Sequence, residues 1–204
     1  PTVQKAAKKF AEVALTPGNV NGGGKAIAAT GFGATANLFA TDKNKCFMMR
    51  QGSFITDFFP DAIKAAYKAN DFTNVGVFKL PAPAGTTDAV LGGGDLAAAF
   101  DDKAATQKVL NFILSDKLGQ GAMLKTYPSY LSAHKTFPSA GYTNPITKNI
   151  AGILSSAKLF GFDGSDLAPA IVNATEWKEL TNWISGKKTQ KQAFDAIDAS
   201  WSKA

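Results

Sequence analysis

The chain has 204 residues, of which 45% are hydrophobic and 19% charged, and this composition allows a globular core while excluding a low-complexity chain. The 22 basic and 16 acidic residues give a net charge of +6. Arg50 is the only arginine and the lysines are spread along helical patterns, so nucleic acid is not expected as a partner.

Cysteine and histidine each occur once, as Cys46 and His134. One cysteine excludes an internal disulfide, and we expect a buried thiol because Cys46 lies in an apolar run at 46–49. A single cysteine and a single histidine are too few ligands for a first-row metal site, so neither a metal nor a cofactor is expected. No apolar stretch approaches the roughly 20 residues of a membrane span, and residues 1–3 show no signal-peptide pattern.

The first 50 residues predict helices alternating with short strands. Thr2 can cap a helix that ends near the Pro-Gly turn at 17–18, because apolar residues recur at helical spacing at Val3, Ala7, Phe10 and Ala14. A loop is predicted at 19–24, a strand at 26–30, a short helix at 34–40 and a strand at 46–50.

Residues 53–100 continue this alternation. Ser53 caps a predicted helix that runs through Tyr67, and 74–80 form a strand that ends at the Pro-Ala-Pro sequence of 81–83. Residues 89–100 form an extended segment broken by glycines, where the backbone approaches a ligand or changes direction. Strands separated by helices predict an α/β layered fold.

The second half of the chain is predicted to be mostly helical. Asp101 or Asp102 caps a helix with an apolar face, and a shorter helix at 118–125 ends at Tyr127-Pro128. An aperiodic loop at 128–145 precedes helices at 145–159, 174–185 and 189–202. The apolar face of the first helix comprises Val109, Leu110, Ile113 and Leu114, and the inward face of the last comprises Ala193, Phe194, Ile197 and Trp201. Trp183 and Trp201 are both assigned to the core.

Two glycine-rich stretches match nucleotide-binding patterns incompletely. Residues 31–36 satisfy G-x-G-x-x-A, but the strand before them is weak and the acidic residue expected about 20 positions later is not clearly supplied. In the Gly-Gly-Gly-Lys run at 22–25, the spacing from Gly18 is one residue too long, and Ala26 stands where a phosphate loop requires serine or threonine. We expect no nucleotide site.

Paired carboxylates raise the possibility of a glycosidase, since two carboxyl groups at a set separation can hydrolyse a glycosidic bond. Asp163 and Asp166 form one such pair, and Asp101 and Asp102 another. The simplest interpretation is that the second pair caps a helix and that Asp166 fixes a turn before Pro169. An enzyme acting through Asp163 and Asp166 remains an alternative, while a Cys46–His134 nucleophilic pair lacks an evident third group.

Aromatic residues beside turns or glycines are the strongest chemical signal. A ring at a groove wall can stack on the apolar face of a sugar, whose hydroxyls then need fixed polar partners. For any single ring, core packing is the commoner role. The rings in question are Phe54, Tyr127, Tyr130, Phe137, Tyr142, Trp177 and Trp183.

Three stretches along the chain carry a family resemblance. They are Gln-Gly-Ser-Phe-Ile at 51–55, Gly-Gly-Gly-Asp at 92–95, and a C-terminal region that begins at 162–170 and continues through Trp177, Trp183 and Gly186 to 195–201. In this order they resemble the carbohydrate-binding extracellular solute-binding proteins of ABC importers, the maltose-binding-protein-like family. The resemblance begins midway through the family pattern.

The resemblance implies an α/β fold that is the C-terminal half of a two-lobed, type II periplasmic-binding-protein-like structure, helix-rich towards the C-terminus. It places residues 1–90 in the second lobe, 91–128 in the first lobe after a hinge crossing, and 129–204 back in the second lobe. Exposed apolar surface is expected where the absent segments belong.

The resemblance also implies a binding site for a neutral mono- or oligosaccharide, in a cleft between the lobes, and no catalysis. Phe54 and Trp177 stand at ligand-facing aromatic positions, and many family members have tryptophan at the first of these. Gly93, Gly94 and Asp95 match a crossover segment whose backbone and acidic side chain meet sugar hydroxyls.

The implied partners are the carbohydrate, the membrane permease subunits of an ABC importer and the N-terminal half of the same protein. The implied location is the periplasm or, with a lipid anchor, the extracellular face of the membrane. Two alternatives remain beside this interpretation: the carbohydrate-active enzyme, and a basic adhesion or scaffold domain.

Overall fold

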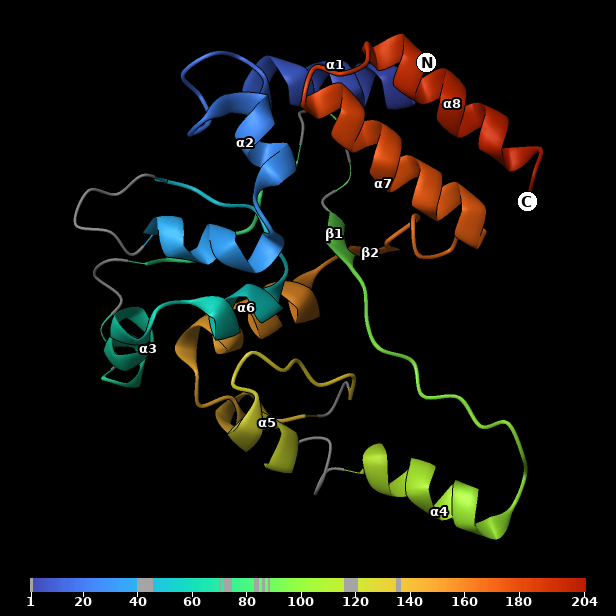
Figure 1. Ribbon diagram of the computed structural model, residues 1–204. Coiled ribbons are helices and arrows are strands. Elements are labelled where there is room, and N and C mark those ends of the chain that lie inside the picture. Colours follow the sequence, from blue (N-terminus) through green and yellow to red (C-terminus); the bar gives the residue numbers. More distant parts are fainter. Residues whose placement is uncertain are drawn as a thin grey trace. The chain divides into compact units, whose positions relative to one another are not determined.

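The structure is a computed structural model, in which the chain forms two compact units (Figure 1). Unit 1 comprises Pro1–Met49 and Asp163–Ala204, and unit 2 comprises Arg50–Phe162. The residues described are 2–39, 46–69, 71, 75–82, 85, 87, 89–115, 121–134 and 137–204.

Unit 1 is helical in its described part. Its elements are α1 (Thr2–Ala14), α2 (Gly23–Ala29), the 3-10 helix η1 (Phe32–Phe39), α7 (Ala170–Ile184) and α8 (Gln190–Trp201). Helices α7 and α8 pack as a hairpin, and α2 packs on α7. The ring of Trp183 lies 5.9 Å from that of Phe10 and 6.1 Å from that of Phe194, so one tryptophan joins α1, α7 and α8.

The turn between α7 and α8 follows from local sequence chemistry. Gly186 has φ 79°, a left-handed conformation that glycine adopts readily, and it directly follows the C-cap of α7. Thr189 then caps α8 in a capping box with Gln192. These two signals fix where one helix ends and the next begins.

Unit 2 consists of short helices and a two-stranded sheet. They are η2 (Ser53–Phe58), α3 (Asp61–Lys68), β1 (Ala89–Gly92), α4 (Ala104–Ile113), α5 (Met123–Thr126), η4 (Ser139–Gly141), α6 (Pro145–Ser156) and β2 (Leu159–Phe162). Strands β1 and β2 pair in parallel, with Ala89 opposite Leu159 and Gly92 opposite Phe162. The result is a helix-rich α/β arrangement, in agreement with the predicted fold class at that coarse level.

The buried apolar residues of unit 2 come from two stretches of the chain, 55–67 and 124–146. They are Ile55, Phe59, Tyr67, Leu124, Tyr142 and Ile146. Burial raises the pKa of Tyr67 to about 12, because the phenolate would lose its hydration. Between Tyr67 and Leu124 none of the described residues is buried, although this stretch contains both β1 and α4.

Several helix predictions are confirmed and others need their boundaries moved. The N-terminal helix begins at Thr2 itself, and α6 and α8 match the expected helices closely. The predicted helix over 53–67 is instead η2 and α3, separated at Pro60, whose ring cannot supply a backbone N–H to a continuous helix. The N-cap residue of α4 is Lys103, not Asp101 or Asp102 as predicted. The Asp101 carboxylate instead accepts a hydrogen bond from the backbone N–H of Lys103.

Three strand predictions are wrong. Residues 26–30 belong largely to helix α2, which the alanine-rich sequence Gly-Gly-Lys-Ala-Ile-Ala-Ala favours. Residues 46–50 form no strand, and neither do 75–80. The strand β2 at Leu159–Phe162 was not predicted, because its four residues follow a strong helical pattern without alternating polarity.

Two burial predictions also need correction. Trp201 is 54% exposed and does not belong to the core, whereas Trp183 packs as expected. Cys46 is half-buried, and its thiol donates to the Met48 carbonyl 3.0 Å away. The predicted boundaries at Ala40, Asn74, Pro83 and Leu118 lie outside the described residues.

Candidate functional site

Phe54 lies in η2 of unit 2 and is held by its own turn. A Cβ atom on Gly52 would lie 2.7 Å from Cε1 of the Phe54 ring, so the ring covers the backbone of residue 52. The neighbouring Ile55 and Thr56 are buried and anchor the helix, while Phe54 is 46% exposed. The glycine in Gln-Gly-Ser-Phe therefore has a packing reason, and part of the ring remains accessible.

A hydrogen bond that no sequence pattern indicates ties η2 to a distant loop. The hydroxyl of Ser129 donates to the carboxylate of Asp57, and Ser129 is buried. The same loop is held from α6, where the hydroxyl of Thr147 donates to the Pro128 carbonyl at 2.7 Å. These contacts position the segment that carries Phe54 against the loop that begins at Tyr127.

The predicted binding segment Gly93, Gly94 and Asp95 follows β1 directly. Its start is fixed because β1 pairs with β2 and because a Cβ on Gly92 would lie 2.7 Å from Cε2 of Phe160. The three residues themselves are exposed and irregular. Their backbone groups and the Asp95 carboxylate therefore face solvent in unit 2.

Trp177 lies in the middle of α7 in unit 1 and is 70% exposed. Val172 and Glu179 are the buried residues of the same helix, so Trp177 lies away from its packed face. The predicted site residues thus divide between the units, with Trp177 in unit 1 and the other four in unit 2. All five are exposed.

Of the two carboxylates of the alternative enzyme site, it is that of Asp163, and not of Asp166 as predicted, that holds the turn. Oδ1 of Asp163 accepts from the backbone N–H of Ser165 at 3.0 Å and from its hydroxyl at 2.8 Å. The Asp166 amide donates to the Asp163 carbonyl at 3.2 Å, as in a tight turn, and its side chain is exposed. The part of the chain that the structure describes contains no group of three or more side chains that could hold a metal ion.

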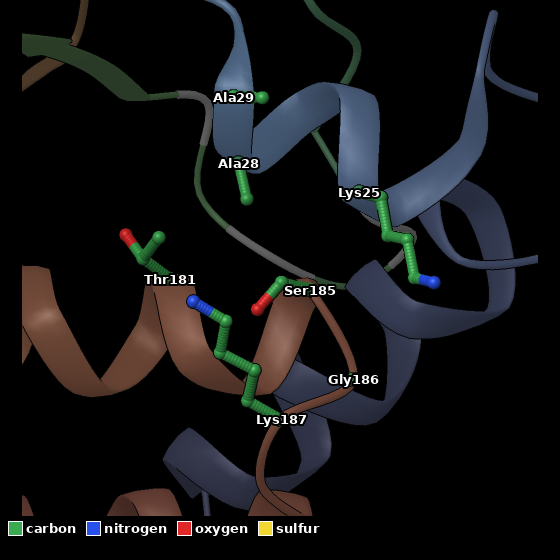
Figure 2. Close-up of a pocket in the computed structure, with 7 residues that line it drawn as sticks. All are labelled: Lys25, Ala28, Ala29, Thr181, Ser185, Gly186 and Lys187. Carbon is green, nitrogen blue, oxygen red and sulfur yellow. The ribbon is translucent and has the colours of Figure 1, made fainter.

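A shallow cavity of about 480 Å³ lies in unit 1 between α2 and the end of α7 (Figure 2). Its lining residues are Lys25, Ala28, Ala29, Thr181, Ser185, Gly186 and Lys187. The two hydroxyls already donate to the carbonyls of Trp177 and Asn182. The two lysines would attract an anion, but the C-terminal end of α7 carries a partial negative charge that would repel it. The charges of the cavity therefore favour no particular class of ligand. It contains none of the predicted site residues.

An ion pair reinforces the α7–α8 turn that follows Trp177. The Lys188 ammonium lies 2.5 Å from the carboxylate of Glu179, which is buried. This hydrogen bond, helped by Asn182, holds the pKa of Glu179 below its ordinary value, although desolvation acts in the opposite direction. The ion pair is therefore a structural contact that depends on an ionised glutamate.

We predict that this contact is lost in acid. Because the folded-state pKa of Glu179 is depressed, its contribution is complete above the unfolded pKa of about 4.3 and disappears as pH falls through the folded value. The difference in urea midpoint between wild type and Glu179→Gln should be constant above about pH 5 and shrink below it. Tryptophan fluorescence provides the measurement because Trp177, Trp183 and Trp201 all lie in unit 1.

The control for this experiment is Glu12→Gln, which removes an exposed pair with Lys9 in α1. We expect this substitution to leave the midpoint nearly unchanged at every pH. A Glu179→Gln effect that persisted unchanged to pH 3 would contradict the proposed ionic role.

Two curated proteins are similar to almost the whole chain. The osmoprotective compounds-binding protein GgtB of Synechocystis sp. is 28% identical over 201 residues, which make up 98% of this chain and 45% of that protein. The alpha-glucosides-binding periplasmic protein AglE of Rhizobium meliloti is 30% identical over 200 residues, which make up 98% of this chain and 42% of that protein. The chain therefore spans less than half the length of either relative.

Other comparisons add no further relatives. The chain matches no protein-family model and no solved structure. No helix among the described residues is long and apolar enough to cross a membrane. The two curated matches confirm the resemblance given by the three sequence motifs: along almost all of its length, this chain is similar to part of two binding proteins, one of osmoprotective compounds and one of alpha-glucosides.

Proposed function

We propose that this chain is the C-terminal half of the substrate-binding component of an ABC sugar importer, and that it binds a neutral mono- or oligosaccharide without catalysis. The observation that carries the proposal is similarity over 98% of the chain to two binding proteins. Because one of them is an alpha-glucosides-binding protein, α-glucosides are the first ligand class to test.

In this proposal the sugar stacks on the rings of Phe54 and Trp177. Both rings are accessible, and each comes from a helix that is anchored by two buried residues, Ile55 and Thr56 in η2 and Val172 and Glu179 in α7. The exposed backbone of Gly93 and Gly94 and the carboxylate of Asp95 would hydrogen-bond the sugar hydroxyls. A phenylalanine offers a smaller stacking face than a tryptophan, so Trp177 should contribute the larger share.

The proposed site belongs to a cleft between two lobes that closes on the ligand by a hinge motion, as periplasmic binding proteins do. Closure is driven only by the difference in ligand affinity between open and closed states. Since part of that cleft would come from the half that this chain does not span, the chain alone should bind weakly. The complete protein would act in the periplasm or, lipid-anchored, outside the membrane, and deliver sugar to permease subunits.

The experiment is a titration of maltose, trehalose, sucrose and methyl α-glucoside, followed by tryptophan fluorescence and by calorimetry. We expect Trp177→Ala to weaken binding of the best sugar at least tenfold, equivalent to about 1.4 kcal/mol, because the stacking surface is removed. Trp201→Ala is the matched control, since it removes another exposed tryptophan of unit 1 and should leave the affinity unchanged.

The salt dependence of the affinity distinguishes this proposal from the alternative in which the basic chain binds a polyanion. Affinity for a neutral sugar should hardly change between 50 and 500 mM NaCl, whereas a polyanion would be released. Equal losses in Trp177→Ala and Trp201→Ala, or a steep salt dependence, would refute the proposed site.

A further inference from the structure

The turn at 163–168, which precedes α7, is tied to that helix by a side chain. Nδ2 of Asn173 donates to the Ser165 carbonyl at 2.6 Å. Within the turn, the amides of Asp166, Leu167 and Ala168 each donate to the carbonyl three residues earlier, at 3.2 to 3.3 Å. The Ser165 carbonyl accepts from both Ala168 and Asn173, so the backbone of the turn has a defined position on α7.

Trp177 lies on the same side of α7 as Asn173. The two residues are four positions apart in the helix, so their Cβ atoms are about 6 Å apart on one face. Helical side chains lean towards the N-terminus, and the indole of Trp177 therefore covers the helix surface on its Asn173 side. Since the Trp177 ring is 70% exposed, the ring and the tethered turn border one accessible surface of unit 1.

The turn carries one carboxylate that has no role in holding it together. Oδ1 of Asp163 accepts from the backbone N–H and the hydroxyl of Ser165. Asp166 is exposed, and none of the residues within the described ranges forms a hydrogen bond or an ion pair with its side chain. A carboxylate on a fixed backbone beside an accessible ring is suited to accept hydrogen bonds from a ligand.

We propose that Asp166 is a further sugar-binding residue, which accepts hydrogen bonds from two neighbouring hydroxyls of the sugar that stacks on Trp177. This inference rests on the proposed function and adds a preference for pyranosides with an intact pair of adjacent hydroxyls. The two oxygens of the carboxylate accept from both hydroxyls while the indole covers the apolar face of the sugar. Asn173 is the positioning residue, because it holds the turn that carries Asp166.

Cations fit this surface less well than a neutral sugar does. Within the described part of the chain, no three histidine, cysteine, aspartate or glutamate side chains gather to hold a metal ion, so Asp166 lacks the further ligands that a metal takes. A quaternary ammonium compound binds aromatic rings through cation–π contacts. The net charge of +6 and the exposed Lys178 next to Trp177 disfavour such a ligand.

The test is a titration of the 204-residue chain with methyl α-glucoside and its 2-, 3-, 4- and 6-deoxy analogues, followed by ligand-observed NMR, which reports weak binding. We expect Asp166→Asn to weaken binding of methyl α-glucoside at least tenfold, because a charged acceptor is lost. In wild type, two analogues that lack neighbouring hydroxyls should show a similar loss. In Asp166→Asn, the same two analogues should bind about as well as methyl α-glucoside.

Asp198→Asn is the matched control, because it neutralises another exposed aspartate of unit 1 and should leave every affinity unchanged. Asn173→Ala should weaken binding of methyl α-glucoside in the wild-type background but not in the Asp166→Asn background. A purely structural role would instead lower the urea midpoint of Asp166→Asn and weaken all five sugars by the same factor.

The role of Asp166 is overturned if Asp166→Asn binds methyl α-glucoside like wild type, if all five sugars lose affinity equally, or if choline binds more tightly than the sugars. A loss of binding in Trp177→Ala without a loss in Asp166→Asn refutes this inference alone and leaves the proposed function standing. A wild-type chain that binds none of the sugars, or a Trp177→Ala variant that binds them unchanged, refutes both.

Discussion

Replacing Trp183 with alanine should destabilise unit 1 by about 3 kcal/mol. Truncating a fully buried aromatic residue typically costs about 3–5 kcal/mol, and we expect the low end because Trp183 is half-buried. Its ring contacts Phe10 on α1 and Phe194 on α8, so the substitution loosens three helices together. Urea unfolding followed by far-ultraviolet circular dichroism is the appropriate measurement, because the variant lacks one of the fluorescent probes.

Trp201→Ala provides the comparison for that experiment. It removes the same side chain from a site that is 54% exposed, where we expect a change within about 0.5 kcal/mol. Trp183→Phe should recover part of the loss because a ring can still meet Phe10 and Phe194. Equal destabilisation by the two alanine substitutions would show that the contacts of Trp183 with Phe10 and Phe194 do not stabilise unit 1.

Gly24→Ala should also destabilise unit 1, by about 3 kcal/mol. A Cβ on residue 24 would overlap the carbonyl oxygen of Ile184 and lie 3.4 Å from Cδ2 of Leu15. The first of these is a backbone atom of α7, which cannot move aside as a flexible side chain can. Overpacking of this kind typically costs 1–3 kcal/mol, and a backbone clash belongs at the upper end of that range.

Tryptophan fluorescence during urea unfolding measures this effect directly, since all three tryptophans lie in unit 1. Gly31→Ala is the control, because no heavy atom lies within 4 Å of its added Cβ and its φ angle is not positive. We expect Gly31→Ala to stay within about 0.5 kcal/mol of wild type. If Gly24→Ala unfolds at the same urea concentration as Gly31→Ala, then α2 does not approach α7 as closely as described.

Local signals predicted the C-terminal helices well. The capping box at Thr189 and the glycine at 186 act within one turn of the chain, so the end of α7 and the start of α8 can be read from neighbouring residues. The helix at α6 is similar, because Asn144 accepts from two backbone amides and Pro145 occupies the first turn. None of these features depends on distant parts of the chain.

Strands were harder to predict because their stability comes from distant partners. β1 and β2 have four residues each and are separated by more than 60 residues, and only their pairing makes either one a strand. Residues 75–80 alternate in burial as a strand would, yet no pairing is described for them. At Pro60 the error has a local cause. The helical periodicity on both sides led us to predict one continuous helix, although the proline itself indicates a break.

The sequence motifs name candidate site residues but say nothing about how these residues are arranged. Family-like motifs single out Phe54, Trp177 and the 93–95 segment, and all five residues are exposed. The bond between Asp57 and Ser129 that braces the Phe54 turn could not be foreseen, because 72 positions separate its partners and no motif connects them.

Unit 1 is formed by two segments of the chain that lie on either side of unit 2 in the sequence, and this couples the folding of the two units. For Pro1–Met49 to meet Asp163–Ala204, residues 50–162 must be closed into a loop. For a flexible chain of that length the length-dependent entropic term is roughly 4 kcal/mol. When unit 2 is already folded, residues 50–162 have lost most of their conformational entropy, so unit 1 then forms at a smaller entropic cost. Substitutions that unfold unit 2 should therefore weaken unit 1 through chain connectivity alone.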